Sequence, residues 1–251
     1  LKRLDDSIQQ PTGNGDNWHM TWAENDCQYS GLCDGTGWNH LPEYSGKNYN
    51  TRIFIIEGNA PNHSFKYLQS YPELESIYPP DKNNPDNYSR YYGFGIIAID
   101  NFIYQFLSTP RVPFGPSGNS FIGAKLIYSP DNGKTWLNQD GSFPVYWEKW
   151  EERNHENMIF FNEPEESFSL LTVLQMGRNY EDNKDGYFYI YAPNGNKDGN
   201  MNQLVMLRIN KERILYRSEY EYFFSHNPDG SANWSNNIED KGIVHTFPSG
   251  W

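Results

Sequence analysis

The sequence predicts an all-β fold, and three observations support this prediction. Helical periodicity is nearly absent, whereas short runs rich in β-branched and aromatic residues alternate with clusters of Asn, Asp, Gly and Pro. Aromatic residues make up 17% of the 251 residues. Mean hydropathy is nevertheless strongly polar, at -0.83. Because disordered chains are poor in aromatic residues, we expect many short strands with aromatic faces, joined by polar loops.

The predicted strands come in pairs along the chain. The clearest pair is a hairpin of residues 93–99 and 102–108, for which Asp100-Asn101 predicts a type I′ turn. One short helix is expected at residues 144–153, where a loop is the alternative. The other predicted strands are 18–23, 28–33, 51–57, 121–128, 134–137, 168–176, 187–191, 204–209, 214–218 and 242–247, the last as the start of a further unit.

These strands form clusters that recur at intervals of several tens of residues. This spacing is typical of the blades of a β-propeller and is longer than the rhythm of about 8–12 residues in a β-sandwich. The clusters indicate three to four blades, so the ring is either incomplete in this chain or closed by its two ends. Because no linker divides the sequence, residues 1–251 are predicted to form a single β-propeller domain.

One turn has a recognisable pattern. Residues 129–136, Ser-Pro-Asp-Asn-Gly-Lys-Thr-Trp, match the Asp-box pattern Ser-x-Asp-x-Gly-x-Thr-Trp. In such a turn the Ser and Asp side chains bind backbone groups, the glycine adopts a positive φ and the tryptophan packs onto the sheet. The pattern is typical of hairpins in sialidase-like and other propellers, and we assign it a structural role.

Charge and composition exclude several classes of partner. The net charge is -12, which argues against a nucleic-acid partner because such a partner requires a basic face. No apolar run approaches about 18 residues, so no membrane-spanning helix is expected. The sequence has neither a His/Cys zinc pattern nor a phosphate-binding glycine loop, so we expect no cofactor. A structural calcium ion stays open, since acidic loops such as 182–185 could supply oxygen ligands. We expect a monomer.

The two cysteines, Cys27 and Cys33, leave three readings open. They could form a disulfide across a hairpin or remain as two free thiols on neighbouring strand positions. The third reading, a cysteine nucleophile, has the least support because no histidine stands in an evident partnering motif.

Residues 16–38 combine carboxylates with tryptophans and predict the wall of a sugar-binding cleft. Flat aromatic rings stack on the C–H faces of sugars, although packing in the core is the common role of any single ring. An arginine later in the chain is a further candidate for contact with the sugar. The predicted substrate-binding residues are Trp18, His19, Trp22, Trp38 and Arg178.

Two aspartates in this segment are candidates for catalysis. Asp16 precedes one predicted strand and Asp34 follows the next, so antiparallel pairing would bring both to one end of the sheet. Asp26 would lie at the opposite end, in the turn. Glycosidic cleavage needs two carboxylates, one protonated and one ionised. The competing interpretation is that these aspartates only cap turns.

The run Gly-Asp-x-Trp-x-x-Thr-Trp-x-x-x-Asp-x-x-Tyr at residues 15–29, followed by Asp-Gly-x-Gly at 34–37, resembles the N-terminal signature of a known family. This family is a group of secreted five-bladed propellers, long catalogued as a domain of unknown function, that includes bacterial endo-D-arabinanases. Residues 176–191 resemble a later segment of the same group, and the likeness extends from about residue 12 to 247.

The resemblance implies a five-bladed propeller and a carbohydrate substrate. For the arabinanases it implies hydrolysis with inversion by two acids of the signature. Matched by position, these are Asp16 and Asp34, with Asp26 as the alternative partner. One departure is that Asn25-Asp26 stands where many members have paired acids.

Three functions therefore remain open for a protein expected to be secreted, periplasmic or on the cell surface. The first is a glycoside hydrolase acting on a cell-wall or plant polysaccharide. The second is a polysaccharide lyase with a Tyr or His base and Arg178, which the net charge disfavours. The third is a non-catalytic glycan-binding propeller. Aspartates that bind only backbone groups would favour the third.

Overall fold

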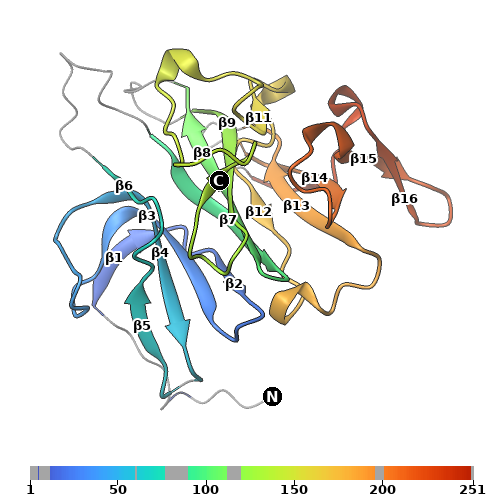
Figure 1. The fold of residues 1–251 in the computed structure, drawn as a ribbon. Helices are drawn as coiled ribbons and strands as arrows, with labels where there is room; N and C mark the ends of the chain where they lie inside the picture. Colours follow the sequence, from blue (N-terminus) through green and yellow to red (C-terminus); the bar gives the residue numbers. More distant parts are fainter. Residues whose placement is uncertain are drawn as a thin grey trace.

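A computed structural model describes residues 5, 12–59, 61–76, 90–111, 120–195 and 201–249. These residues form three antiparallel sheets, which confirms the predicted all-β class (Figure 1). The expected helix at 144–153 is reduced to one 3₁₀ turn, Trp150–Glu152. Lys149 N, just before this turn, donates a hydrogen bond to the Glu152 carboxylate. No helix in the described part of the chain is long and apolar enough to cross a membrane.

The first sheet is organised around one long strand. Strand β3 pairs with β2 through its first residues and with β1 through its last ones, and β4 lies on its other side. The strands are β1 (Gly13–Asp16), β2 (Met20–Trp22), β3 (Gln28–Trp38), β4 (Tyr49–Glu57), β5 (Ser64–Tyr67) and β6 (Leu74–Glu75).

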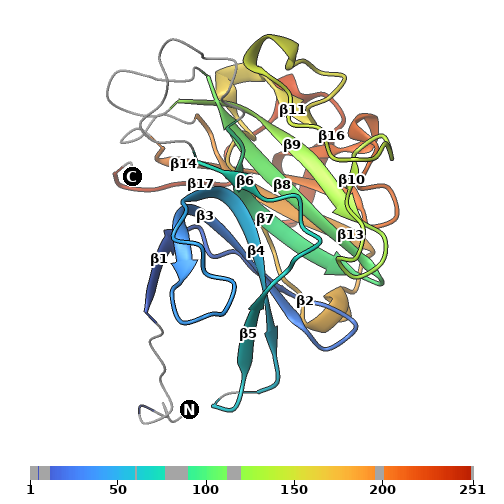
Figure 2. The same ribbon diagram turned by 60° about the vertical axis from the view of Figure 1, so that its left-hand side comes forward.

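The second sheet is a meander in which β7, β8, β9 and β10 lie side by side, with β11 beside β9 (Figure 2). Its strands are β7 (Tyr92–Ile99), β8 (Phe102–Pro110), β9 (Phe121–Ser129), β10 (Leu137–Asn138) and β11 (Phe160–Phe161). The predicted hairpin is therefore present. Its turn, however, is not type I′, because only Asp100 of the two turn residues has a positive φ.

The third sheet corrects two expectations. Residues 214–218 are not a strand, because Ile214 is buried in the core and the chain then makes the 3₁₀ turn Arg217–Glu219. Residues 242–247 do not start a further unit, since β17 pairs back with β14. The strands are β12 (Thr172–Val173), β13 (Tyr187–Pro193), β14 (Gln203–Asn210), β15 (Glu221–His226), β16 (Ala232–Ser235) and β17 (His245–Thr246).

The three sheets share their apolar cores. One core joins the first and second sheets through residues such as Ile53 and Ile96, and another joins the second and third through residues such as Phe106 and Phe188. At the centre, β7 contacts both β2 and β12, so the strands of the three sheets meet there and extend outward (Figure 1). Three sheets do not close a ring, and a five-bladed propeller stays a prediction.

The turn at residues 129–136 is held by its own side chains. Ser129 Oγ accepts a hydrogen bond from Gly133 N at 2.7 Å, and Asp131 Oδ1 accepts one from Thr135 N at 2.8 Å. Gly133 has φ +85° and Trp136 is buried. These contacts fix the β9–β10 connection, and the Asp-box name remains a prediction.

Candidate functional site

Asp16 and Asp34 lie along the C-terminal half of β3, the half that pairs with β1. Asp16 is the last residue of β1 and lies opposite Cys33, the neighbour of Asp34. The two strands approach closely because glycines face each other: a Cβ on Gly35 would lie 2.3 Å from Gly15 Cα. Asp34 does not follow a strand, as the sequence suggested, since β3 continues through it to Trp38.

Asp16 is held by side-chain donors. Its Oδ1 accepts a hydrogen bond from the Cys33 thiol at 2.8 Å and another from the Asn17 amide at 3.1 Å. Burial, followed by the bond to Asp16, raises the pKa of Cys33 well above its usual value, so this thiol stays protonated and acts as a donor. Both cysteines are free thiols, which settles the disulfide question left open by the sequence.

The environment of Asp34 favours the protonated form of its carboxyl group. The residue is open to solvent, yet crowding of its carboxyl by protein atoms raises its pKa, and the negative charge of Asp16 raises it further, while Arg90 opposes both effects. Asp34 also has a positive φ of 50°, as does Asn17, the residue after Asp16, at 49°. Asp and Asn adopt this region more readily than other non-glycine residues.

Arg90 and Tyr92 lie where β7 of the second sheet begins. The Arg90 guanidinium lies 5.6 Å from the centre of the Tyr92 ring. Burial raises the pKa of Tyr92 to about 12, while the positive charge of Arg90 lowers it and the negative charge of Asp34 raises it. The sequence did not indicate Arg90, and its only signal is a basic residue three positions before the predicted strand 93–99.

His19 is half-buried just before β2. Its ring lies 5.7 Å from that of Phe94 on β7, and burial lowers its pKa, so the imidazole is neutral at pH 7. Phe94 in turn lies 6.3 Å from Phe121. Strands β7 and β9 of the second sheet therefore place two partly exposed rings next to the neutral imidazole of His19.

Trp18 and Trp38 stack on each other, with ring centres 5.0 Å apart and planes 23° apart. They pack on the face of the first sheet that carries Phe54, Phe65 and Tyr67. The Trp18 indole donates to the carbonyl of Gly15 at 3.1 Å. These two tryptophans thus brace β1, and the sugar-binding role predicted for them stays a prediction.

The remaining predicted residues gather at the other end of β3. The Trp22 indole donates to Asp26 Oδ1 at 2.9 Å, and Arg178 Nη1 lies 3.8 Å from the same oxygen. A cavity of about 230 Å³ opens beside them, lined by Met20, Thr21, Trp22, Gln28, Gln175 and Gly177. The structure therefore groups Asp26 with Trp22 and Arg178, and groups Asp16 with Asp34.

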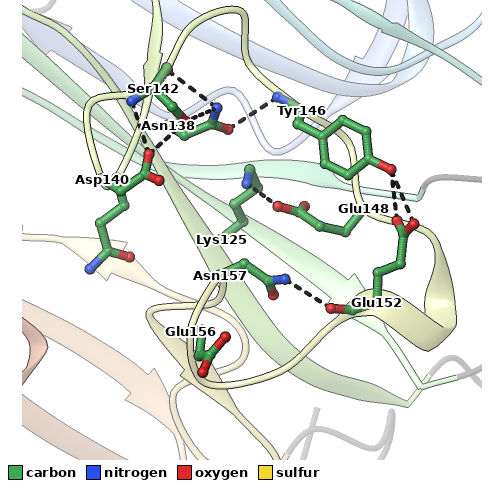
Figure 3. Close-up of a pocket in the computed structure, with 10 residues that line it drawn as sticks. Lys125, Asn138, Asp140, Ser142, Tyr146, Glu148, Glu152, Glu156 and Asn157 are labelled. Atoms are coloured by element: carbon green, nitrogen blue, oxygen red, sulfur yellow. Dashed lines mark hydrogen bonds and ion pairs between the residues drawn. The ribbon is translucent and has the colours of Figure 1, made fainter.

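A larger cavity, of about 250 Å³, lies against β9 and β10 and is covered by the loop of residues 139–157 (Figure 3). At its wall the Lys125 ammonium donates to Glu148 Oε1 at 2.6 Å, and both side chains are buried. Tyr91 donates to the other Glu148 oxygen at 2.7 Å. No sequence motif indicates this cavity: its acidic residues belong to the loop 139–157, and only the fold places Lys125 of β9 against them.

The described residues contain no group of three or more His, Cys, Asp or Glu side chains placed to hold a metal ion. In the loop suggested for calcium, the Asp185 carboxylate accepts hydrogen bonds from Tyr187 N at 3.0 Å and Tyr189 Oη at 2.5 Å. Its oxygens are therefore engaged by protein donors.

Comparisons with known proteins show only distant structural similarity. No family model matches the sequence, and no curated protein matches it. Among solved structures, the chain is similar to a "putative hydrolase" from Bacteroides ovatus ATCC 8483, with 14% sequence identity and a TM-score of 0.49. The match covers 93% of this chain and 57% of that one, so the chain spans little more than half of that protein's length.

Proposed function

We propose that this protein is a secreted glycoside hydrolase that cleaves a cell-wall or plant polysaccharide, with Asp34 as general acid and Asp16 as general base. One observation carries the proposal: the pairing of β1 with β3 places Asp16 opposite Cys33, the neighbour of Asp34, and the negative charge of Asp16 contributes to the raised pKa of Asp34. A carboxyl group that keeps its proton beside a second carboxylate is the arrangement that a general acid and a general base require.

The chemistry follows from these environments. Asp34 keeps its proton to higher pH than a free aspartate and transfers it to the glycosidic oxygen as the bond to the anomeric carbon breaks. Asp16 removes a proton from the water molecule that attacks that carbon. The thiol of Cys33 and the amide of Asn17 hold the accepting carboxylate in place. In line with the family resemblance, we propose that the anomeric configuration is inverted.

The surroundings favour a neutral glycan. The chain carries a net charge of -12, and the carboxylate pair adds negative charge at the site itself. Neutral His19 offers a hydrogen-bond partner for sugar hydroxyls, and Phe94 and Phe121 offer ring surface nearby. A uronic-acid polymer would meet only Arg90 as a nearby cation among the groups that affect Asp34.

The test is release of reducing ends from a panel of plant and bacterial cell-wall glycans, including D-arabinan. The parent protein is compared with Asp16→Asn and Asp34→Asn, and with Asp26→Asn as a matched control at the far end of β3. We expect both site variants to lose at least about a hundredfold in rate, the size of a general acid or base contribution, and the control to retain activity. Proton NMR of the fresh product reports its anomeric configuration.

Circular dichroism establishes that each variant is folded. Loss of activity in the control as well as in the site variants would contradict the assignment to Asp16 and Asp34. Release of no sugar by the parent from any glycan, with glycan binding retained, would instead leave a non-catalytic binding protein.

A further inference from the structure

The cavity beneath the loop of residues 139–157 shares no residue with the carboxylate pair (Figure 3). We propose that it is a second binding site, which holds a single neutral sugar residue. The choice of a sugar as ligand rests on the proposed function, whereas the existence of the site rests on the cavity itself. Its volume of about 250 Å³ lies below the range of about 300–1,000 Å³ for drug-sized ligands, which suits one sugar ring.

A buried ammonium group at the cavity has N–H donors that the described residues do not use. Lys125 lines the cavity with only 2% of its side chain exposed, and within the described residues its Nζ makes one hydrogen bond, to Glu148. A lysine ammonium has three N–H donors. Unused donors in a buried place are costly, so a ligand that accepts from them would be stabilised.

The loop 139–157 supplies hydrogen-bond acceptors to the same cavity. Asp140 accepts bonds from Ser142 through Oδ1, which leaves its second oxygen for a ligand. Gln139 donates through Nε2 to Leu215, which leaves its carbonyl oxygen. The exposed Glu156 carboxylate lies at the same cavity. Because a hydroxyl group both donates and accepts, a polyol fits a cavity that offers both kinds of partner.

The charge and the exposed tyrosine ring of the cavity indicate the kind of ligand. Four carboxylates and one ammonium line the cavity, so anionic sugars and phosphates are disfavoured. Tyr146 adds a ring that is 54% exposed, and its hydroxyl is fixed by hydrogen bonds to both Glu152 oxygens, at 3.1 and 2.9 Å. A ring held in this way presents a flat apolar surface at the edge of the cavity (Figure 3). Together these features favour a neutral sugar stacked on Tyr146.

The test is titration of the whole chain, as the Asp34→Asn variant, with millimolar L-arabinose, D-xylose, D-galactose or D-glucose, followed by isothermal calorimetry and NMR. Glucuronate and calcium chloride are titrated in parallel. We expect binding of at least one neutral sugar. Tyr146→Ala should weaken that binding by about tenfold or more, which corresponds to about 1.4 kcal/mol. Glu156→Gln should weaken it less, through loss of one charged acceptor.

Phe143→Ala is the matched control, because Phe143 is an exposed ring on the same loop that does not line the cavity. It should leave binding unchanged. The proposal is overturned if no neutral sugar binds, if the Tyr146 and Glu156 variants bind as tightly as their parent, or if calcium binds in place of sugars and Glu156→Gln abolishes it. Because Asp34→Asn is used throughout, binding here is independent of whether the protein hydrolyses glycans.

Discussion

Replacement of Lys125 by methionine should strongly destabilise the protein. The Lys125 and Glu148 side chains are 2% and 6% exposed, and their charged atoms lie 2.6 Å apart. Without the ammonium, the buried Glu148 carboxylate would lose its ion-pair partner Lys125, while Tyr91 would still donate to it. Removal of one partner of a buried ion pair costs about 3–5 kcal/mol. The free energy of unfolding, measured by urea titration with tryptophan fluorescence, should fall by that amount.

The double variant Lys125→Met/Glu148→Gln distinguishes pairing from simple loss of packing. The glutamine is neutral and can still accept from Tyr91, so the double variant should be more stable than the sum of the single changes predicts, with a coupling of about 1–3 kcal/mol. The exposed pair Lys66–Glu57 is the control, and Lys66→Met should have a much smaller effect. A small cost for Lys125→Met, or the absence of coupling to Glu148, would refute the buried pair.

Two further predictions concern the carboxylate end of β3. Gly35→Ala should displace β1 and with it Asp16, since the new Cβ would meet backbone atoms at 2.3–2.6 Å. Glycan cleavage should therefore fall sharply. Gly31→Ala on the same strand is the control and should retain activity, because its nearest contact is at 3.5 Å. An unchanged rate in Gly35→Ala would contradict this reasoning. The raised pKa of Asp34 means that its ionisation destabilises the fold as pH rises above the unfolded value of 3.8, so Asp34→Asn should have a higher Tm than the parent at pH 7 and an equal Tm below pH 3.8. Calorimetry at both pH values measures this, and an equal Tm at pH 7 would count against the shift.

The parts of the fold that the sequence predicted are those with a strong local pattern. Strand β13 alternates between half-buried and buried side chains, as its Tyr-Phe-Tyr-Ile-Tyr sequence suggests. Residues 214–218 misled the prediction because a short apolar run is equally suited to a strand and to a buried turn. There Ile214 and Tyr220 both enter the core, and Tyr220 donates to the Ile214 carbonyl at 2.7 Å. Only packing against the other strands decides between the two.

The candidate site was predictable in part for the same reason. Antiparallel pairing predicted that Asp16 and Asp34 lie close together at an end of the sheet; in the structure Asp34 lies inside β3, and the partner strand of that part of β3 is β1. Arg90, Lys125 and Glu148 could not be placed, because their roles depend on contacts between segments far apart in sequence. Local patterns report which face of a strand is buried, and they do not report which charges meet across sheets.

The length of β3 explains why the predicted site residues separate into two groups. The strand contains 11 residues, from Gln28 to Trp38, and Asp26 precedes it. At about 3.3 Å per residue, the extended chain places Asp34 roughly 20 Å beyond Gln28. The carboxylate of Asp26 in the β2–β3 turn is therefore far from Asp34, whereas β1, paired with the last residues of β3, places Asp16 opposite Cys33, next to Asp34. Of the three aspartates, strand pairing thus brings only Asp16 and Asp34 together, and for this reason the proposed function assigns catalysis to them.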